Sequence, residues 1–214
     1  MNFGNEWPIM ALTKKQFIPD GLKNLYLSLL SRLIRWLADK GIHPNVLTTL
    51  TFLFSLLSGV VLAQGHLRLG GVLILVAGTF DILDGAVARL AGLATKFGAF
   101  YDSTLDRYAE FFTFFGILFY YLHASPVNDF LILTVCLAMC GSLMVSYVRA
   151  RAEGLGLECK IGIMQRPERI VLLGFGAIFH ENILTTAIVL IAVFANFTAV
   201  QRIFYIKSIL SSRN

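Results

Sequence analysis

Long apolar runs recur through most of this 214-residue sequence, and short polar or charged segments separate them. Hydrophobic residues make up 57% of the chain and charged residues only 14%, a balance that excludes an ordinary soluble domain. Because a helix needs about 20 apolar residues to cross the hydrocarbon core, the runs predict transmembrane helices. We therefore predict an all-α integral membrane protein with six transmembrane helices, over residues 45–64, 70–90, 98–122, 128–149, 167–181 and 183–205.

An amphipathic segment precedes the first apolar run. Leu25, Leu29 and Leu33 recur at helical spacing, and Arg32 and Arg35 fall between them. This pattern predicts a helix that lies in the membrane interface, and a soluble helix packed on a partner is the alternative. The predicted organisation is an N-terminal tail at 1–20, the interfacial helix at 21–41, the six-helix domain at 42–209 and a C-terminal tail at 210–214.

Basic residues predict the orientation in the membrane. They precede the first apolar run, lie between the second and third and between the fourth and fifth runs, and close the chain, whereas the alternate loops carry only Arg68. By the positive-inside rule, both termini of this multi-pass chain are cytoplasmic. The net charge of +5 therefore indicates membrane orientation and anionic ligands, with no nucleic acid as partner. The membrane we expect is the plasma membrane of a prokaryote.

Polar residues interrupt three apolar runs at their cytoplasmic ends. Asp81 cuts the second run, Asp102 and Asp106 lie in the first turns of the third, and the fifth is short after Arg169. Polar groups are costly at membrane depth unless they line a wet cavity or pair with one another. We therefore expect a polar cavity that opens to the cytoplasm, with the active site inside it.

Four aspartates form the strongest chemical signal. Asp81 and Asp84 are spaced i, i+3, and Asp102 and Asp106 are spaced i, i+4, so each pair shares one helix face. The short turn containing Gly92 makes the two helices antiparallel neighbours, and the two pairs can then face each other. Converging carboxylates need a compensating cation, and oxygen ligands select Mg²⁺, Mn²⁺ or Ca²⁺. A cation or proton transporter is the alternative from a different functional class, because transporters also use intramembrane carboxylates.

Residues around the aspartates suit a phosphate ligand. Gly85 lacks a side chain directly after Asp84, which lets a ligand approach closely, and Gly98 does the same or permits close helix packing. Arg89 lies two turns beyond Asp81 and can bind a phosphate oxygen or a carboxylate.

The spacing of these residues resembles a known family signature. Asp81-x2-Asp84-Gly85-x2-Ala88-Arg89-x8-Gly98-x3-Asp102-x3-Asp106 matches that of the CDP-alcohol phosphatidyltransferases at every fixed position. The resemblance implies six transmembrane helices, a homodimer and two Mg²⁺ or Mn²⁺ ions. It also implies that the first three aspartates bind metal, with Asp102 on both ions, and that Asp106 is the general base and a further ligand. The CDP contacts that it implies are Asn45, Asp81, Asp84, Gly85, Ala88, Arg89 and Thr95.

The acceptor is predicted from residues 146–169, which resemble the phosphatidylinositol phosphate synthase branch and its archaeal archaetidylinositol relatives. Members of that branch bind a sugar phosphate through basic side chains. The corresponding acceptor phosphate-binding residues here are Arg149, Arg166 and Arg169, with Arg202 at the end of the last span. The alternative is that these arginines serve only membrane orientation.

Together these features predict transfer of a phosphatidyl or archaetidyl group from CDP-diacylglycerol or CDP-archaeol to a soluble phosphorylated alcohol, inositol phosphate, with release of CMP. Asp106 takes the proton from the acceptor hydroxyl. Other acceptors remain open within the family: glycerol 3-phosphate, which would make the enzyme a phosphatidylglycerophosphate synthase, or an unphosphorylated alcohol. A catalytically inactive scaffold is disfavoured, because none of the signature aspartates is substituted.

Overall fold

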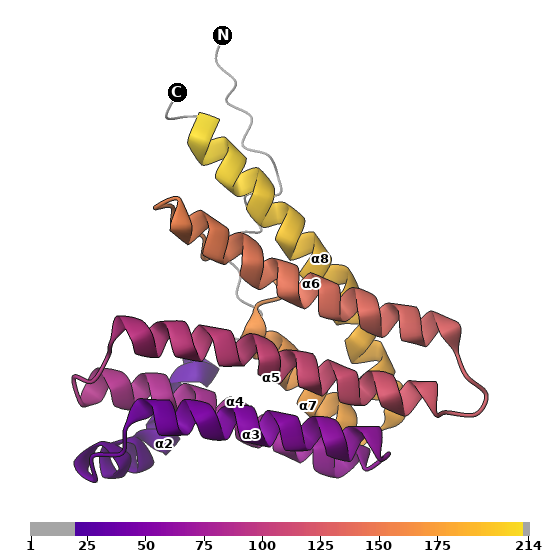
Figure 1. The fold of residues 1–214 in the computed structure, drawn as a ribbon, viewed down its shortest axis with the longest axis horizontal. Helices are drawn as coiled ribbons and strands as arrows, with labels where there is room; N and C mark the ends of the chain where they lie inside the picture. Colours follow the sequence, from indigo (N-terminus) through magenta and orange to yellow (C-terminus); the bar gives the residue numbers. More distant parts are fainter. Residues whose placement is uncertain (1–19, 212–214) are drawn as a thin grey trace.

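The computed structural model describes residues 20–211 and is helical throughout that range apart from turns and one longer connection (Figure 1). The predicted N-terminal tail and the last three residues lie outside the described residues, except that the first helix already includes Asp20. The helices are α2 (Asp20–Asp39), α3 (Pro44–Ala63), α4 (Leu67–Leu90), α5 (Lys96–Leu122), α6 (Asp129–Gly154), α7 (Arg166–Phe179) and α8 (Glu181–Ser211).

Four of these helices are long and apolar enough to cross a membrane: α3, α4, α6 and α8. The other two predicted spans are helices as well, but each departs from a simple span. The charged residues of α5 are concentrated in its first half, and α7 has only 14 residues. The prediction of an all-helical integral membrane chain is confirmed, with four helices that meet the criteria for a span.

Helix boundaries follow the predicted apolar runs to within three residues, with two exceptions: α6 continues five residues past the predicted end at 149, and α8 continues past 205. The sequence predicts that the last run ends at 205, but α8 continues to Ser211. Its extension has an apolar face in which Tyr205, Ile206 and Ile209 pack against Leu157 and Cys159 of the α6–α7 connection. Burial of this face explains why the helix does not end where the membrane-spanning run ends.

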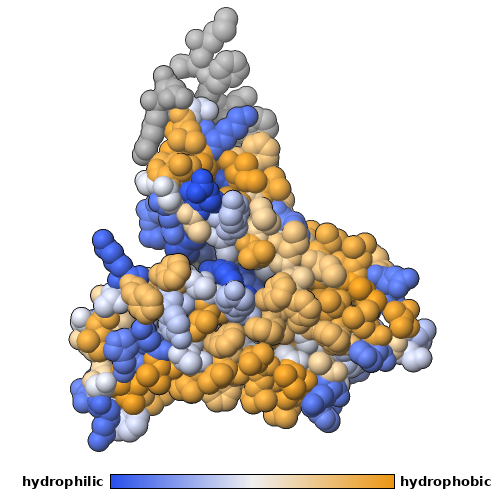
Figure 2. Space-filling model, in the orientation of Figure 1, coloured by the Kyte–Doolittle hydropathy of each residue, from blue (hydrophilic) through white to orange (hydrophobic). Residues whose placement is uncertain are grey.

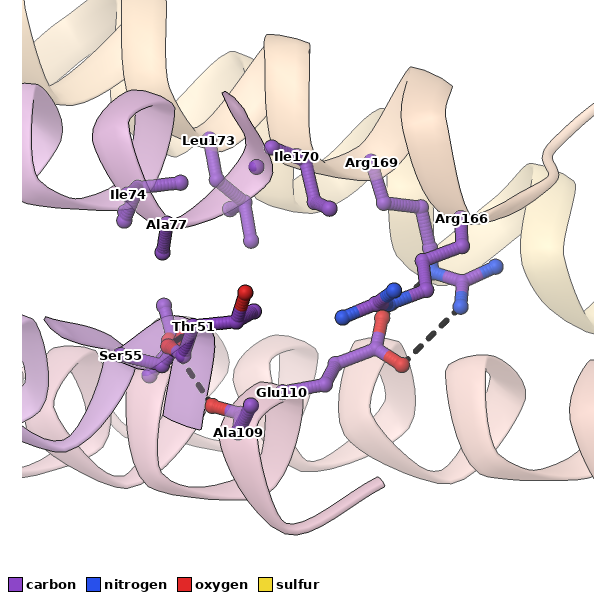
Figure 3. Close-up of a pocket in the computed structure, with 12 residues that line it drawn as sticks. Thr51, Ser55, Ile74, Ala77, Ala109, Glu110, Arg166, Arg169, Ile170 and Leu173 are labelled. Carbon is purple, nitrogen blue, oxygen red and sulfur yellow. Dashed lines mark hydrogen bonds and ion pairs between the residues drawn. The ribbon is translucent and has the colours of Figure 1, made fainter. Parts of the chain in front are cut away.

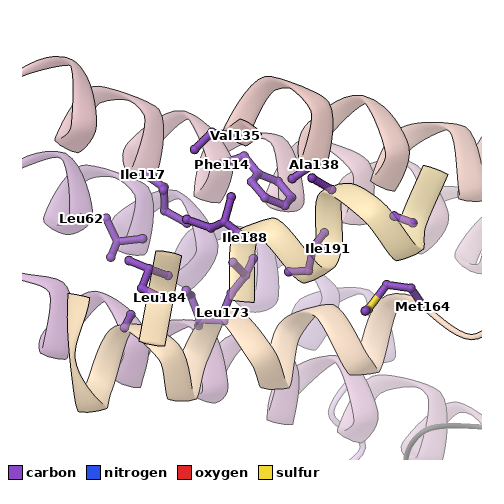
Figure 4. Packing of buried hydrophobic residues seen from close by; sticks show 14 of the residues in the cluster. Leu62, Phe114, Ile117, Val135, Ala138, Met164, Leu173, Leu184, Ile188 and Ile191 are labelled. Carbon is purple, nitrogen blue, oxygen red and sulfur yellow. The ribbon is translucent and has the colours of Figure 1, made fainter. Parts of the chain in front are cut away.

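The helices are arranged around two close associations. α3 packs along both α4 and α5, and α6 packs along α8 (Figure 1). α7 joins the two groups, because it packs against α4 on one side and α8 on the other. Leu62, Phe114, Leu173, Leu184 and Ile188 meet at this junction in the main apolar core (Figure 4).

The outer surface is rich in exposed apolar side chains (Figure 2). Phe130 is 68% exposed and Phe204 61% exposed, and a surface with many such side chains is typical of a chain embedded in lipid. Figure 2 also shows hydrophilic side chains gathered in the notch between the protruding ends of α6 and α8 and the body of the molecule. The polarity of this notch contrasts with the apolar belt around it.

The N-terminal helix α2 is amphipathic, as predicted. Ile34 and Leu37 are buried against Leu83 and Val87 of α4. Its other face exposes apolar side chains, including Leu29 at 72%, next to basic residues. The buried face therefore supports α4 from behind, at the level where α4 carries its two aspartates.

Glycines bring α3 and α5 into unusually close contact. A Cβ atom on Gly116 would overlap the backbone of Gly59, and a Cβ on Gly59 would overlap the backbone of Phe112. Small residues allow such close approach between helices, and dispersion attraction between the two backbones then replaces the hydrophobic driving force that lipid does not supply. This contact sets the position of α5 relative to α3.

We expect Gly116→Ala to destabilise the protein, because its new methyl group can only be accommodated by moving α3 away from α5. Overpacking of this kind costs about 1–3 kcal/mol. Gly154→Ala is the matched control, since nothing lies within 4 Å of the added carbon. Thermal unfolding in detergent measures both. Equal melting temperatures for Gly116→Ala and the control would contradict this role of the α3–α5 contact.

Candidate active site

The four predicted aspartates lie at one end of the bundle, on either side of the turn between α4 and α5. Asp81 and Asp84 lie in the last three turns of α4, and Asp102 and Asp106 in the first three turns of α5. Gly92 allows the tight turn because its φ is +65°, in the left-handed region that favours glycine.

The predicted antiparallel neighbours α4 and α5 pack mainly against α3 rather than against each other. The two helices are therefore splayed, and their aspartates reach across the space between them. Three carboxylates meet there, and Asp81, Asp102 and Asp106 each offer an oxygen within 4.8 Å of the others. The predicted convergence is thus present for three of the four aspartates, although α3 rather than direct contact of α4 with α5 produces it.

These carboxylates fit a divalent cation. Oδ1 of Asp102 is buried and has no hydrogen-bond partner among the described residues. A buried carboxylate oxygen without a partner is strongly unfavourable, whereas a hard cation is bound by several such oxygens. Residues Asp81, Asp102 and Asp106 form the donor set that fits Mg²⁺ or Mn²⁺.

Asp84 lies outside this group of three and is held by a different contact. It is only 6% exposed and accepts a hydrogen bond of 2.8 Å from the hydroxyl of Thr48 on α3. Sequence reasoning missed Thr48, which is 36 positions away. The contact fixes the orientation of the Asp84 carboxylate, as second ligand shells do at metal sites.

Arg166, the first residue of α7, bridges two of the aspartates. Its guanidinium lies 2.5 Å from Oδ1 of Asp81 and 2.6 Å from Oδ1 of Asp106. The connection that precedes it is anchored by the backbone N–H of Met164, which donates to the hydroxyl of Thr198 at 3.1 Å. α7 thus begins with a cation directed at the carboxylates.

Arg169, one turn further along α7, has a different partner. Its guanidinium donates two hydrogen bonds to Glu110, of 2.6 and 3.0 Å, and a third of 3.2 Å to the carbonyl of Met164 (Figure 3). Arg169 is 1% exposed. Glu110 is not among the predicted site residues, although its i, i+4 spacing from Asp106 is a signal that could have identified it.

The other two predicted arginines lie on α6 and α8. Arg202 is 2% exposed and donates to the backbone carbonyls of Ile161 and Val145, at 2.8 and 2.5 Å. Arg149 is exposed and pairs with Glu153 at 2.8 Å. Both Arg149 and Arg169 lie within electrostatic range of Arg202. We refer to Arg166, Arg169, Arg202 and Arg149 as the arginine series, in which Arg169 is paired with Glu110 and Arg149 with Glu153.

A further arginine is absent from the sequence prediction. Arg107 follows Asp106 directly, and its Nη1 lies 3.9 Å from Oδ2 of that carboxylate. It also lies within electrostatic range of Arg166 and Arg169. The site therefore combines a cluster of carboxylates with an adjoining cluster of guanidinium groups.

The predicted nucleotide-binding residues lie at the same end of the bundle. Gly85, Ala88 and Arg89 occupy the last two turns of α4. A Cβ on Gly85 would lie 3.3 Å from the Arg89 guanidinium, so the glycine leaves room for that side chain. Thr95 is the N-cap of α5.

Asn45 lies opposite that N-cap, in the first turn of α3. A Cβ on Gly98 would lie 3.3 Å from Oδ1 of Asn45 and 3.1 Å from the hydroxyl of Thr95. Gly98 therefore allows close contact between the starts of α3 and α5.

A small cavity extends from the site into the bundle (Figure 3). Its volume is about 30 Å³, enough for a water molecule. Arg166, Arg169 and Glu110 line one end, and Ile74 and Leu173 line the other. The change from charged to apolar walls marks where the polar site ends inside the helix bundle.

Comparison with known proteins identifies the family of this chain. A family model described as CDP-alcohol phosphatidyltransferase matches residues 41–209. The archaetidylinositol phosphate synthase of Methanothermobacter thermautotrophicus is 38% identical over 194 residues, which cover 88% of this chain and 96% of that relative. The phosphatidylinositol phosphate synthase of Mycobacteroides abscessus is 34% identical over 174 residues, covering 78% of this chain and 79% of that relative.

Solved structures with the same fold come from Mycobacterium tuberculosis phosphatidylinositol phosphate synthase. Its crystal structure with CDP-DAG bound has a TM-score of 0.75 and 30% identity, covering 84% of this chain and 94% of that one. Its complex with manganese and citrate has a TM-score of 0.74 and 31% identity, covering 82% and 88%. The chain thus belongs to the CDP-alcohol phosphatidyltransferase family and is a transferase embedded in the membrane.

Proposed function

We propose that this enzyme transfers the phosphatidyl or archaetidyl group of a CDP-linked lipid to a hydroxyl of inositol phosphate and releases CMP. The observation that carries the proposal is the junction of three converging carboxylates with Arg166, the first in a series of arginines. A phosphorylated acceptor needs such a cation close to the reacting centre. The archaetidylinositol phosphate and phosphatidylinositol phosphate synthases among its relatives support the choice of acceptor.

The metal site in this proposal consists of Asp81, Asp84, Asp102 and Asp106, with two Mg²⁺ or Mn²⁺ ions and Asp102 on both. Three of these carboxylates already lie within reach of one ion, and Thr48 orients the fourth. When bound, the ions supply neutralising charge for the diphosphate and for the departing CMP. The manganese complex of the M. tuberculosis relative supports this choice of metal.

Asp106 is proposed as the general base. Its carboxylate takes the proton from the acceptor hydroxyl as that oxygen forms a bond to the lipid-side phosphorus. The bond between this phosphorus and the bridging oxygen breaks, and the electron pair leaves with CMP. Asp106 is suited to the role because it lies between the carboxylate cluster and Arg166, where both substrates must meet.

The nucleotide is proposed to bind over the α4–α5 turn. Asn45, Gly85, Ala88, Arg89 and Thr95 would contact CDP, and Asp81 and Asp84 would do so as well. The support is that all of these residues lie at one end of the bundle and that Asn45 faces the N-terminus of α5. Unpaired backbone N–H groups at a helix N-terminus favour anions.

The acceptor phosphate is proposed to bind along the arginine series. Arg166 is the inner member and Arg149, exposed on α6, is the outer one. Arg169 lines the cavity beside Arg166, and Arg202 lies on α8; their hydrogen bonds hold Glu110 and backbone carbonyls. Guanidinium groups suit this role because they bind phosphate through two parallel hydrogen bonds.

For the membrane arrangement, we propose six transmembrane helices with both termini and the active site cytoplasmic, in the plasma membrane of a prokaryote. In this proposal, α5 and α7 complete the six spans and α2 lies in the interface. The domain then runs from 42 to 209, with tails at 1–20 and 210–214. We also propose a homodimer and, as donor, CDP-diacylglycerol or CDP-archaeol.

Replacing Asp106 by Asn should lower transfer about 10²–10⁴-fold, because the general base is lost while the shape of the side chain is kept. Binding of the CDP-lipid should change little. CMP release measures turnover, and a filter-binding assay measures donor affinity. Asp129→Asn, at the first residue of α6 and away from the four aspartates, is the control. Near-normal turnover of the Asp106 variant would rule out this residue as the base.

Replacing Thr48 by Val should weaken divalent-metal affinity by about 10–100-fold, because the Asp84 carboxylate loses the contact that orients it. Electron paramagnetic resonance of Mn²⁺ binding to the substrate-free enzyme measures this directly. Thr134→Val on α6 is the matched control, because its hydroxyl bonds only to its own helix backbone. Unchanged Mn²⁺ affinity in the Thr48 variant would remove Thr48 from the site.

An acceptor screen tests the substrate. With CDP-diacylglycerol and Mg²⁺ or Mn²⁺, CMP release should be fastest with inositol phosphate and slower with glycerol phosphate, inositol and serine. Loss of the acceptor's phosphate removes a charge-assisted hydrogen bond, so we expect a preference of about tenfold or more over free inositol. Equal rates with free inositol would contradict the proposed arginine pocket, and a preference for glycerol phosphate would identify a different acceptor.

A further inference from the structure

Two ion pairs connect α5 and α7. Asp106 and Glu110 lie one turn apart on α5, and Arg166 and Arg169 lie one turn apart on α7. The first ion pair joins Arg166 to Asp106, and the second joins Arg169 to Glu110. The first pair belongs to the reaction site. The second takes no part in the proton transfer or in the bond changes at phosphorus.

The second pair contains the more deeply buried arginine. Arg169 is 1% exposed and donates to both oxygens of Glu110, so the two planar groups are held side by side. A third hydrogen bond ties the same guanidinium to the carbonyl of Met164, just before α7 begins. A buried, bidentate pair of this kind permits only a narrow range of positions.

Such a pair fixes the register of α7 against α5. A slip of one helical turn moves α7 by about 5.4 Å and would place Arg169 next to Asp106. Glu110 would then lose its only ion-pair partner in the described structure, and an unpaired buried charge is strongly unfavourable. The ion pair of Arg169 with Glu110 therefore excludes the alternative pairing of Arg169 with Asp106.

The position of α7 depends on this ion pair as well as on helix packing. α7 has only 14 residues and follows a connection that is not helical from 155 to 165. Its other contacts include close glycine packing, because a Cβ on Gly71 of α4 would lie 2.6 Å from the carbonyl oxygen of Gly174. The pair of Arg169 with Glu110 adds a directional, charged contact to this packing, next to the contact of Arg166 with Asp106.

We infer that Glu110 and Arg169 are positioning residues, which hold α7 in the register that presents Arg166 to the acceptor phosphate beside Asp106. They act through Arg166 and touch neither substrate. The inference rests on the proposed function, because it takes Arg166 as the group that binds the phosphorylated acceptor. It assigns to Arg169 a task different from that of Arg149 and Arg166.

A double-mutant cycle of Glu110→Gln and Arg166→Gln tests the inference. Each single variant should raise the KM for inositol phosphate about tenfold or more, because each removes the effect of one charge-assisted contact. The KM for the CDP-lipid should stay within about twofold in Glu110→Gln. In the Arg166→Gln background, Glu110→Gln should raise the acceptor KM by no more than about twofold.

A purely structural role for Glu110 would give multiplicative losses in this cycle and would raise the KM for both substrates, which overturns the inference. An unchanged acceptor KM in Glu110→Gln, together with a raised one in Arg166→Gln, overturns it as well and leaves the proposed function intact. An unchanged acceptor KM in Arg166→Gln instead overturns the acceptor role of Arg166 and, with it, the inference.

Two further variants serve as a replacement and as a control in this test. If Glu110→Gln does not fold, Glu110→Asp replaces it in the same cycle; it keeps the charge but withdraws the carboxylate by one methylene, and the same non-additivity is expected. Glu181→Gln, at the opposite end of the bundle, is the matched control and should leave both KM values unchanged. A raised acceptor KM in Glu181→Gln would show a general effect of removing a carboxylate and would overturn the inference.

Discussion

Repulsion among carboxylates in a membrane-embedded helix bundle is the constraint on which the rest of the structure depends. Four aspartates lie on two successive helices, and at that depth each charge needs a partner or access to water. Arg166 neutralises two of them, Thr48 donates to a third, and Asp102 keeps an unpaired oxygen. The helices that surround the site position these partner side chains next to the carboxylates.

The positions of these side chains depend on close backbone packing away from the site. Gly59 and Gly116 let α3 and α5 approach closely, which keeps α3 as the shared support of α4 and α5. α3 in turn carries Thr48 and Asn45 into the site from its first turns. On the other side, Arg202 ties α8 to the connection before α7. The chemistry is therefore concentrated at one end of a bundle whose rigidity is established along its full length.

Much of this could be predicted from the sequence because it depends on local spacing. The apolar runs give the helix bounds to within three residues except at the ends of α6 and α8, and the i, i+3 and i, i+4 spacings place each aspartate pair on one face. Contacts between distant residues could not be predicted in the same way. Thr48 and Asp84 are 36 positions apart, and Glu110 and Arg169 are 59. Spacing shows that Glu110 shares a face with Asp106, but only the folded chain shows which arginine it binds.

The shortness of α7 has a consequence for the surrounding membrane. Its 14 residues span about 21 Å, against a hydrocarbon core of about 30 Å. One face exposes Val171, Phe175 and Phe179. Lipids adjust to a short apolar segment by thinning locally. In the proposed six-span arrangement, the membrane next to α7 would therefore be thinned, and the acyl-chain length of the surrounding lipids would act on the depth of the reacting groups.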